Sequence, residues 1–427
     1  MARRHAIIGA LFLALALAPA AEAFEDLGGH WARQEVEILQ ARGLVETAAR
    51  FHPDQLISRA EMVKLLVVAI EGHQTARQLA PLPSSFSDLG PRHWANGYVE
   101  SAYERGLVLG AGQGAFGPDR PVTRAEVTVL LVRAAGWEAE ALDRDPVAAR
   151  RALPFSDVAA IPGWAAGHVL AAWERGLVGG YPDGDFRPQG NTTRGEAAAL
   201  VTRLLRRQGL LYDLTGELVA MEGASLTVAC GTGERRVTAG PETVFYRQGL
   251  PAGAADLCLL DEVRVVLAPG GEVLYLEAFL HDAVVKLSAV SLSGRSLSFG
   301  AGGDQVTVKV AETAALIRNG SPARLSDFQP GDRLYIMFSL LAGEVRAAWG
   351  ARIDFEGTVA GAAAGRLEII LDGGPRRAFA LAPVATLVLD GRPVGIDELQ
   401  PGDRVGLTLN PQGALLFVDA VRPEPSP

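Results

Sequence analysis

The chain has 427 residues, of which 48% are hydrophobic and 21% are charged, and its formal net charge is -9. This composition is ordinary for a globular protein and excludes wholesale disorder. The acidic balance argues against a nucleic-acid partner, because a general nucleic-acid binder needs a basic face to neutralise phosphates. At ~100–200 residues per domain, the length predicts two to four domains.

The N-terminal residues have the organisation of a secretory signal peptide. Arg3 and Arg4 give a basic start, residues 6–18 form an apolar run, and an Ala-x-Ala cleavage pattern ends at Ala23. The apolar run is too short to span a bilayer of ~30 Å. We therefore expect a signal peptide over residues 1–23 and an exported mature protein. No later run of ~18 uninterrupted apolar residues follows, which predicts no integral membrane segment.

The next part of the chain contains three copies of one unit, expected over residues 24–72, 86–136 and 153–207. Each copy has a Phe-x-Asp start, a tryptophan, an Arg-Gly-Leu-Val segment, a Phe-x-Pro segment and a final Ser/Thr-Arg-x-Glu segment. The spacing from the tryptophan to the final arginine is nearly constant, from Trp31 to Arg59, from Trp94 to Arg124 and from Trp164 to Arg194. So many aligned features in three copies indicate an internal repeat.

Each copy is predicted to be a helix, a loop and a second helix. Gly43, Gly106 and Gly176 follow the first helical pattern and supply the left-handed residue that ends a helix. The second helix begins with a capping box, in which a hydroxyl and a glutamate satisfy backbone N–H groups. The predicted capping pairs are Ser58 and Glu61, Thr123 and Glu126, and Thr193 and Glu196. Because one unit of ~50 residues buries too little to stand alone, the three copies should share a core.

These repeated motifs resemble S-layer homology (SLH) domains, which carry Phe-x-Asp, Gly-x-x-x-x-Phe-x-Pro and Thr-Arg-Ala-Glu segments. The resemblance covers roughly residues 24–207, under half of the chain. It implies a pseudo-threefold helical cluster that binds secondary cell-wall polysaccharide non-covalently, with a pyruvylated amino sugar as the favoured ligand. It also implies a secreted protein at the cell wall or cell surface, or on the periplasmic side of the envelope in a diderm.

The arginine inside each capping box is the strongest ligand-binding candidate. It lies in the first turn of a helix, where the helix dipole disfavours a cation and no structural need calls for one. Its guanidinium and the free helix N–H groups would together form an anion site, suited to the carboxylate of a pyruvyl ketal. The three residues are Arg59, Arg124 and Arg194.

Two further repeated positions are weaker candidates. A tryptophan can stack on a sugar or anchor the core, and the resemblance adds weight to a groove-lining role. The aspartate of Phe-x-Asp can cap the first helix or its preceding turn, and the resemblance places it near the ligand. The residues are Trp31, Trp94 and Trp164, and Asp26, Asp88 and Asp157. The repeated phenylalanines are expected in the core.

The three copies differ in the loop before Phe-x-Pro. The third copy contains Gly180 and Tyr181 and matches the family's loop closely, so both residues join the ligand-binding candidates. The second copy has Leu109-Gly110-Ala111-Gly112 and lacks the tyrosine, and the first has Glu46-Thr47-Ala48-Ala49-Arg50 and lacks both. We therefore expect one or two working grooves rather than three equal ones.

From about Leu214 the sequence changes to short alternating segments with glycine turns, which predicts strands. Pro-Gly-Asp at Asp332 recurs at Asp403, and a degenerate copy lies at the same interval before it, at Asp261. The fold class is therefore multidomain, with an all-α repeat region followed by three all-β modules. The modules are expected over 214–282, 283–353 and 354–422, as small barrels or sandwiches that resemble OB-like or SH3-like modules. Pro-Gly-Asp is interpreted as a turn before a strand.

Catalytic motifs are missing from the sequence. It has no G-x-S-x-G, no H-E-x-x-H and no P-loop, so we expect no enzyme, no metal site and no cofactor. Cys230 and Cys258 lie in the same predicted module, where either a disulfide or two thiols is compatible with the sequence. The favoured function is a wall-anchored surface protein whose β modules have a structural role, with self-association in a surface layer. The alternatives are a binding protein whose β modules recognise a glycan or protein partner, and a wall-anchored enzyme of unrecognised type.

Overall fold

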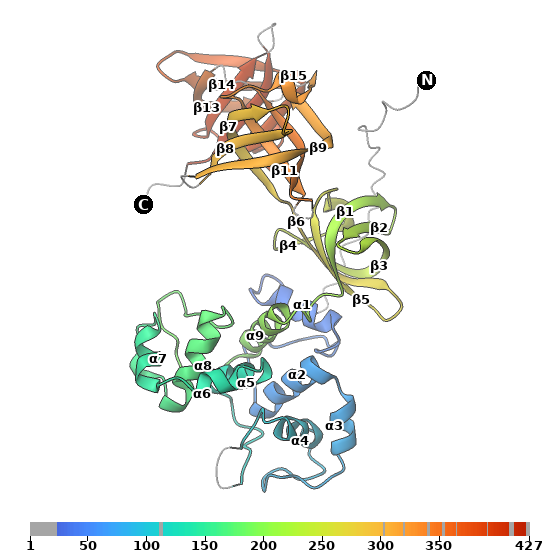
Figure 1. The fold of residues 1–427 in the computed structure, drawn as a ribbon, viewed down its shortest axis with the longest axis vertical. Coiled ribbons are helices and arrows are strands. Elements are labelled where there is room, and N and C mark those ends of the chain that lie inside the picture. The colour runs from blue at the N-terminus through green and yellow to red at the C-terminus, as the bar shows by residue number, and fades with distance from the viewer. Residues whose placement is uncertain are drawn as a thin grey trace. The chain divides into compact units, whose positions relative to one another are not determined.

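The computed structural model describes residues 24–423, except for 111–113, 302–303, 319–320, 340–341, 352–354, 364, 391 and 410–413. The signal peptide predicted over residues 1–23 lies outside the described residues. Helices form the N-terminal half and strands the C-terminal half, as expected (Figure 1). The chain divides into two compact units, one of Met1–Leu214, Val237–Asp256 and Arg264–Glu277, the other of Thr215–Arg236, Leu257–Val263 and Ala278–Pro427.

Each repeat contains the two principal helices that the sequence predicts. The first helices are α1 (Arg33–Ala41), α4 (Asn96–Glu104) and α8 (Gly163–Glu174), and the second helices are α2 (Arg59–Glu71), α5 (Arg124–Ala134) and α9 (Arg194–Arg207). The connections between repeats add α3 (Gln74–Leu79), α6 (Glu138–Leu142), α7 (Pro146–Ala152) and the 3-10 turn η1 (Val158–Ala160). Gly43, Gly106 and Gly176 have φ of 71°, 70° and 61°, which confirms their left-handed role after each first helix.

The three repeats close around a ring of backbone hydrogen bonds. The Ile57 N–H donates to Thr192 O (3.0 Å), the Thr192 N–H to Val122 O (2.9 Å), and the Val122 N–H to Ile57 O (3.2 Å). Each residue comes from a different repeat, so the ring returns to its start and gives the helical half its pseudo-threefold arrangement. The phenylalanines expected in the core are buried, at 7% exposure or less: Phe24, Phe51, Phe86, Phe116, Phe155 and Phe186.

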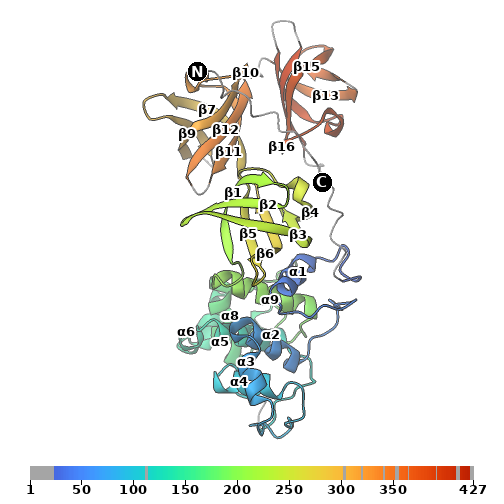
Figure 2. The same ribbon diagram turned by 90° about the vertical axis from the view of Figure 1, so that its right-hand side faces the viewer.

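The C-terminal half is all-β, as predicted, and forms three six-stranded sheets that appear as separate groups of strands in Figure 2. The first contains β1 (Leu214–Glu222), β2 (Ser225–Cys230), β3 (Gly233–Arg247), β4 (Leu250–Ala252), β5 (Glu262–Leu267) and β6 (Glu272–Phe279). The second contains β7 (Asp282–Ser291), β8 (Ser296–Ala301), β9 (Asp304–Arg318), β10 (Ser321–Pro322), β11 (Arg333–Ser339) and β12 (Glu344–Ala351). The third contains β13 (Phe355–Ala363), β14 (Arg366–Leu371), β15 (Arg376–Leu389), β16 (Arg392–Pro393), β17 (Arg404–Leu409) and β18 (Leu415–Val421).

Strand pairing describes these modules more specifically than the expected barrels or sandwiches. The first sheet has the order β2-β1-β5-β6-β3-β4, and an additional pairing joins β2 to β3. The other two sheets repeat this order and the same additional pairing, β8 with β9 and β14 with β15. In both of them one pair is parallel, β9 with β12 and β15 with β18. The internal sequence repeat is therefore a repeat of one strand topology.

The aspartates of the Pro-Gly-Asp segments are structural, as predicted. Asp332 is buried, and its carboxylate accepts from the Gln329 N–H (2.9 Å) and from Nε and Nη2 of Arg318 (2.8 and 2.9 Å). Asp403 repeats the arrangement with the Gln400 N–H and Arg422. In the degenerate first copy, Asp261 accepts from the Cys258 N–H at 2.9 Å. Each carboxylate therefore holds the turn that leads into a strand.

The first compact unit includes residues beyond the last helical repeat. Tyr246, Val266 and Tyr275 belong to the same buried cluster as the helical core. The buried carboxylate of Glu37 in α1 accepts from the Tyr246 hydroxyl at 2.7 Å, and Gln34 donates to the Tyr275 hydroxyl at 2.8 Å. The core of this unit thus extends past residue 207, where the sequence predicted the last helical repeat to end.

The two cysteines of the first β module, Cys230 and Cys258, do not form a disulfide in the structure. Cys230 is half-buried at the end of β2, Cys258 is exposed, and both are thiols in the part of the chain that the structure describes. Of the two options left open by the sequence, the structure has the reduced one.

Candidate ligand-binding grooves

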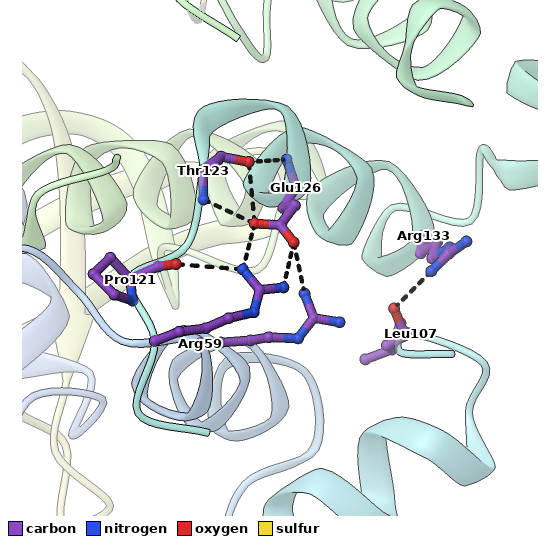
Figure 3. A network of polar contacts seen from close by, with 7 residues as sticks. Arg59, Leu107, Pro121, Thr123, Glu126 and Arg133 are labelled. Atoms are coloured by element: carbon purple, nitrogen blue, oxygen red, sulfur yellow. Dashed lines mark hydrogen bonds and ion pairs between the residues drawn. The ribbon is translucent and has the colours of Figure 1, made fainter. Parts of the chain in front are cut away.

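The second helix of each repeat begins with the predicted capping box. In α5 the Thr123 hydroxyl accepts from the Glu126 N–H (3.3 Å), and the Glu126 carboxylate accepts from the Thr123 N–H (3.0 Å), as Figure 3 shows. The same reciprocal pairs are present for Ser58 with Glu61 and for Thr193 with Glu196. The hydroxyls and glutamates therefore have the structural role expected of them.

The predicted anion site on free helix N–H groups is wrong, because the helix starts dock on loops of the neighbouring repeat. In α2 the Arg59 N–H donates to Arg120 O (2.9 Å) and the Ala60 N–H to Pro118 O (3.0 Å). The corresponding acceptors are Gly190 O and Pro188 O for α5, and Gln55 O and Pro53 O for α9. These donors are already satisfied, so a ligand would have to bind to side chains rather than to the helix terminus.

The capping-box arginines reach across to the next repeat instead. The guanidinium carbon lies over a phenylalanine ring of that repeat, at 5.0 Å for Arg59 over Phe116, and the other two arginines repeat this contact at 5.2 and 4.8 Å. Arg59 and Arg124 are buried, at 6% and 9% exposure. The cation–π contact offsets the unfavourable helix dipole, and it explains why an arginine is tolerated at each helix start.

Two of these arginines line hollows, which we name after the helix beside them. The α2 groove has a volume of about 400 Å³ and is lined by Glu61 and Lys64 of α2, Trp94 of the second repeat and Arg194 of the third. The α5 groove has a volume of about 250 Å³ and is lined by Arg59 of the first repeat, Glu126 and Arg133 of α5, and Trp164 of the third. Each groove therefore combines side chains from all three repeats.

The three repeated tryptophans are not core residues. Trp31, Trp94 and Trp164 are 60%, 50% and 57% exposed, among the most exposed large apolar side chains of the helical half. Trp94 lines the α2 groove and Trp164 the α5 groove. The pseudo-threefold relation that places Trp94 beside α2 and Trp164 beside α5 places Trp31 beside α9. The residues next to Trp31 in the sequence are consistent with this position. A Cβ added at Gly195 of α9 would lie 3.2 Å from the Ala32 side chain and 3.4 Å from His30.

The α5 groove has a dense cluster of cations, shown in Figure 3. Glu126 accepts from Arg120 in a two-bond ion pair and lies 3.5 Å from Arg59. Burial would raise the pKa of Glu126, but the bonds from Arg120 and the Thr123 N–H, with the charge of Arg59, lower it to about 2. Burial lowers the pKa of Arg59, as do Arg120 and Arg133, while Glu126 opposes them. Arginine still keeps its proton at any physiological pH.

The third arginine lies under a side chain of the third repeat. Arg124 donates to Gly179 O at 2.8 Å, and its guanidinium carbon is 4.7 Å from the centre of the Tyr181 ring. The Tyr181 hydroxyl donates to Glu196. Tyr181 and Glu196 thus cover Arg124 at the start of α9, where we name the corresponding position the α9 groove. Gly180 has a packing role, because a Cβ there would lie 3.0 Å from the Phe155 ring.

The repeated aspartates do not cap the first helices. The carboxylate of Asp88 accepts from the Phe116 and Gly117 N–H groups, both at 2.7 Å, and Asp26 and Asp157 bind the equivalent loops. Burial would raise the pKa of Asp88, but these backbone donors outweigh it and lower the pKa. The aspartates therefore hold the Phe-x-Pro loop on which a neighbouring helix docks, which is a structural role.

Sequence reasoning missed four cations near the grooves, Arg50, Lys64, Arg120 and Arg133. Lys64 lies almost one helical turn after the capping glutamate of α2, and Arg133 lies two turns after that of α5. Both spacings place a side chain on the same helix face as that glutamate. This helical spacing is the signal that would have found them. Arg120 lies in a loop and has no such signal.

The family model of the S-layer homology domain matches residues 23–63, 85–128 and 154–198. The chain contains three SLH domains. In the part of the chain that the structure describes, no helix is both long and apolar enough to cross a membrane. SLH domains are found in cell-surface proteins that are anchored to the cell wall.

Named relatives share the SLH region with this chain. A surface layer protein of Brevibacillus choshinensis is 28% identical over 43% of the chain and 16% of its own length. The middle cell wall protein of Brevibacillus brevis is 38% identical over 29% of the chain and 11% of its own length. An amylopullulanase of Thermoanaerobacterium thermosulfurigenes is 32% identical over 44% of the chain and 10% of its own length. The chain thus spans only a small part of these relatives.

Among solved structures, a multidomain protein with nucleic acid binding domains from Streptococcus pneumoniae is 12% identical with a TM-score of 0.13. The aligned region covers 50% of this chain and 73% of the other protein's chain, and a TM-score this low does not establish a shared fold.

Proposed function

We propose that the SLH domains hold this exported protein on the cell wall by binding an anionic secondary cell-wall polysaccharide in the grooves. The observation that supports this is the pairing of an arginine with an exposed tryptophan in the α2 and α5 grooves. A guanidinium forms charge-assisted hydrogen bonds with a carboxylate, and an indole ring packs against the C–H face of a sugar. A pyruvylated amino sugar offers both groups on one residue of the polymer.

For the β modules we propose a structural role at the cell surface, including self-association in a surface layer, and no catalytic activity. The repeated turn aspartates Asp332 and Asp403 support this, because their oxygens are bound to arginine and backbone donors.

The test is co-sedimentation with purified cell walls. The variant changes Trp31, Trp94 and Trp164 together to alanine, since these exposed residues can be removed without opening the core. The matched control changes Leu142 and Val147, which are 66% and 53% exposed on α6 and α7 away from the groove linings. We expect the tryptophan variant to stay in the supernatant and the control to sediment with the wall. Removing pyruvate from the wall should release the parent protein.

Full sedimentation of the tryptophan variant would contradict the groove as the binding site. Binding to pyruvate-free walls would leave the groove in place but exclude the ketal carboxylate as its ligand.

A further inference from the structure

The three arginines of the capping boxes differ in how their charge is compensated. At the α5 groove, the lining residues Arg59, Arg133 and Glu126 pair with one another or with Arg120 and Glu138 beside the lining, and three cations against two acids leave one positive charge in excess. Arg133 is held on Glu138 at 3.0 Å and on Leu107 O at 3.3 Å, and Figure 3 shows the second of these bonds. Within the described residues, Nε of the buried Arg59 has no hydrogen-bond partner, and Nε of the buried Arg124 has none either.

An arginine nitrogen that is buried without a partner is costly, but Arg59 and Arg124 share this cost, so it does not distinguish their grooves. The excess positive charge does distinguish the α5 groove, because it favours an anion. The exposed ring of Trp164 lines the same hollow and offers a face for the attached sugar. Excess positive charge and an aromatic wall therefore meet in one groove of about 250 Å³.

The α2 groove has the same components, but its charges are balanced. Arg194 donates to Glu61 at 2.9 Å and to Phe51 O at 2.9 Å. The other cations of its lining are paired as well, because Lys64 donates to Glu46 at 2.7 Å and Arg50 lies 3.6 Å from Glu25. Each cation already has a carboxylate, so an incoming anion has to displace one of them. We therefore expect weaker binding of a carboxylate here than in the α5 groove.

The α9 groove has a protein side chain over its arginine. The Tyr181 ring lies 4.7 Å from the guanidinium carbon of Arg124 and 4.2 Å from that of Arg187, and its hydroxyl is held by Glu196. The first repeat has Thr47 and Ala48 in this part of its loop, and the second has Ala111, which lies outside the described residues. Only the third repeat has a tyrosine in this loop of its sequence.

We propose that the grooves are specialised: the α5 groove is the principal carboxylate site, the α2 groove is a weaker one, and Tyr181 closes the α9 groove. This inference rests on the proposed function and refines it. It assigns the strongest binding to a groove that lacks the family's tyrosine. The loop of the third repeat resembles the family's loop most closely, and its Tyr181 covers Arg124 instead of leaving that arginine open to a ligand.

The test uses the three tryptophans as matched reporters, one for each groove. Each is changed singly to alanine in the full chain, and binding of purified, solubilised wall polysaccharide is measured by isothermal titration calorimetry. We expect Trp164→Ala to weaken binding roughly tenfold, Trp94→Ala roughly threefold and Trp31→Ala less than twofold. Equal losses for all three variants, or the largest loss for Trp31→Ala, would overturn the specialisation while leaving the proposed function intact.

A second variant addresses the tyrosine directly. Tyr181→Ala should uncover Arg124 and add a binding site per chain, whereas Tyr181→Phe keeps the ring over Arg124 and should leave the stoichiometry unchanged. A loss of affinity in Tyr181→Ala with unchanged stoichiometry would show that Tyr181 contacts the ligand, and it would overturn the closed groove. If the parent chain binds no polysaccharide at all, the proposed function itself fails, which is distinct from an unequal response of the grooves.

Discussion

Both halves of this chain repeat an arginine beside an acid, but they use the pair differently. In the β half, Arg318 gives Asp332 two hydrogen bonds, and Arg422 does the same for Asp403, so the acids are saturated. In the helical half, Arg59 lies 3.5 Å from Glu126 and keeps an unsatisfied Nε within the described structure. The comparison teaches that repetition alone does not identify a binding residue. An acid whose oxygens are already saturated, such as Asp332, has a structural role.

The largest effect should come from breaking a saturated pair in the β half. Arg318→Ala leaves the buried carboxylate of Asp332 without its charge partner and should destabilise the second β module by about 3 kcal/mol or more. The exposed pair of Arg376 and Glu368 is the control, because Arg376→Ala should cost under about 1 kcal/mol. Urea denaturation measures both. Equal, small effects would mean that the β-half pairs are no more structural than surface ion pairs.

The acid of the α5 groove, Glu126, should make the stability of the helical half depend on pH. The pKa of Glu126 is about 2 in the folded protein, against 4.5 for the free side chain. A lowered pKa contributes stability that is present above pH 4.5 and is lost as the pH falls towards 2. We expect the helical half to lose about 2 kcal/mol over this range through Glu126. Glu126→Gln should flatten that part of the stability profile, measured by denaturation across this acidic range. An unchanged slope would contradict the ion-pair assignment.

The contact between α1 and the first β module offers an intermediate case, an acid with both a charged and a neutral donor. Glu37 accepts from Tyr246 and from Arg33 Nε at 2.9 Å, so Tyr246→Phe removes one donor and leaves the charge paired. The expected loss is about 1–2 kcal/mol in a thermal melt of the full chain. Tyr103→Phe, at a residue that is 45% exposed, serves as control and should change little. A silent Tyr246→Phe variant would argue against this hydrogen bond in solution.

The smallest effect should come from the capping hydroxyls, which are structural members of the helical half. Thr123→Ala removes the acceptor for the Glu126 N–H and should cost about 1 kcal/mol. Thr123→Ser keeps the acceptor and should be near the parent. Polysaccharide affinity should stay within about twofold in both, since the hydroxyl points at the helix backbone. A folded Thr123→Ala variant that no longer binds walls would move Thr123 into the ligand site.

Local features of the fold were predictable because their physics lies within a few residues. The capping pairs, the left-handed glycines and the buried phenylalanines follow from hydrogen-bond spacing, backbone strain and hydrophobic periodicity. All three depend on residues that are close together in the sequence. The turn role of Pro-Gly-Asp was predictable for the same reason. The helix N–H groups were misjudged, because their acceptors, such as Arg120 O and Pro118 O for α2, belong to a loop of the next repeat that is distant in the chain.

By itself the sequence determined the repeats, the residue types in each groove and the inequality of the three copies. Only the tertiary structure decided which of these residues meet, because the hydrogen-bonded ring of Ile57, Val122 and Thr192 sets each arginine against the next repeat and each tryptophan against the preceding one. Burial then decided what their charge can do. An arginine is the same cation in all three copies, but the solvent it loses and the carboxylates or aromatic rings it gains differ from groove to groove.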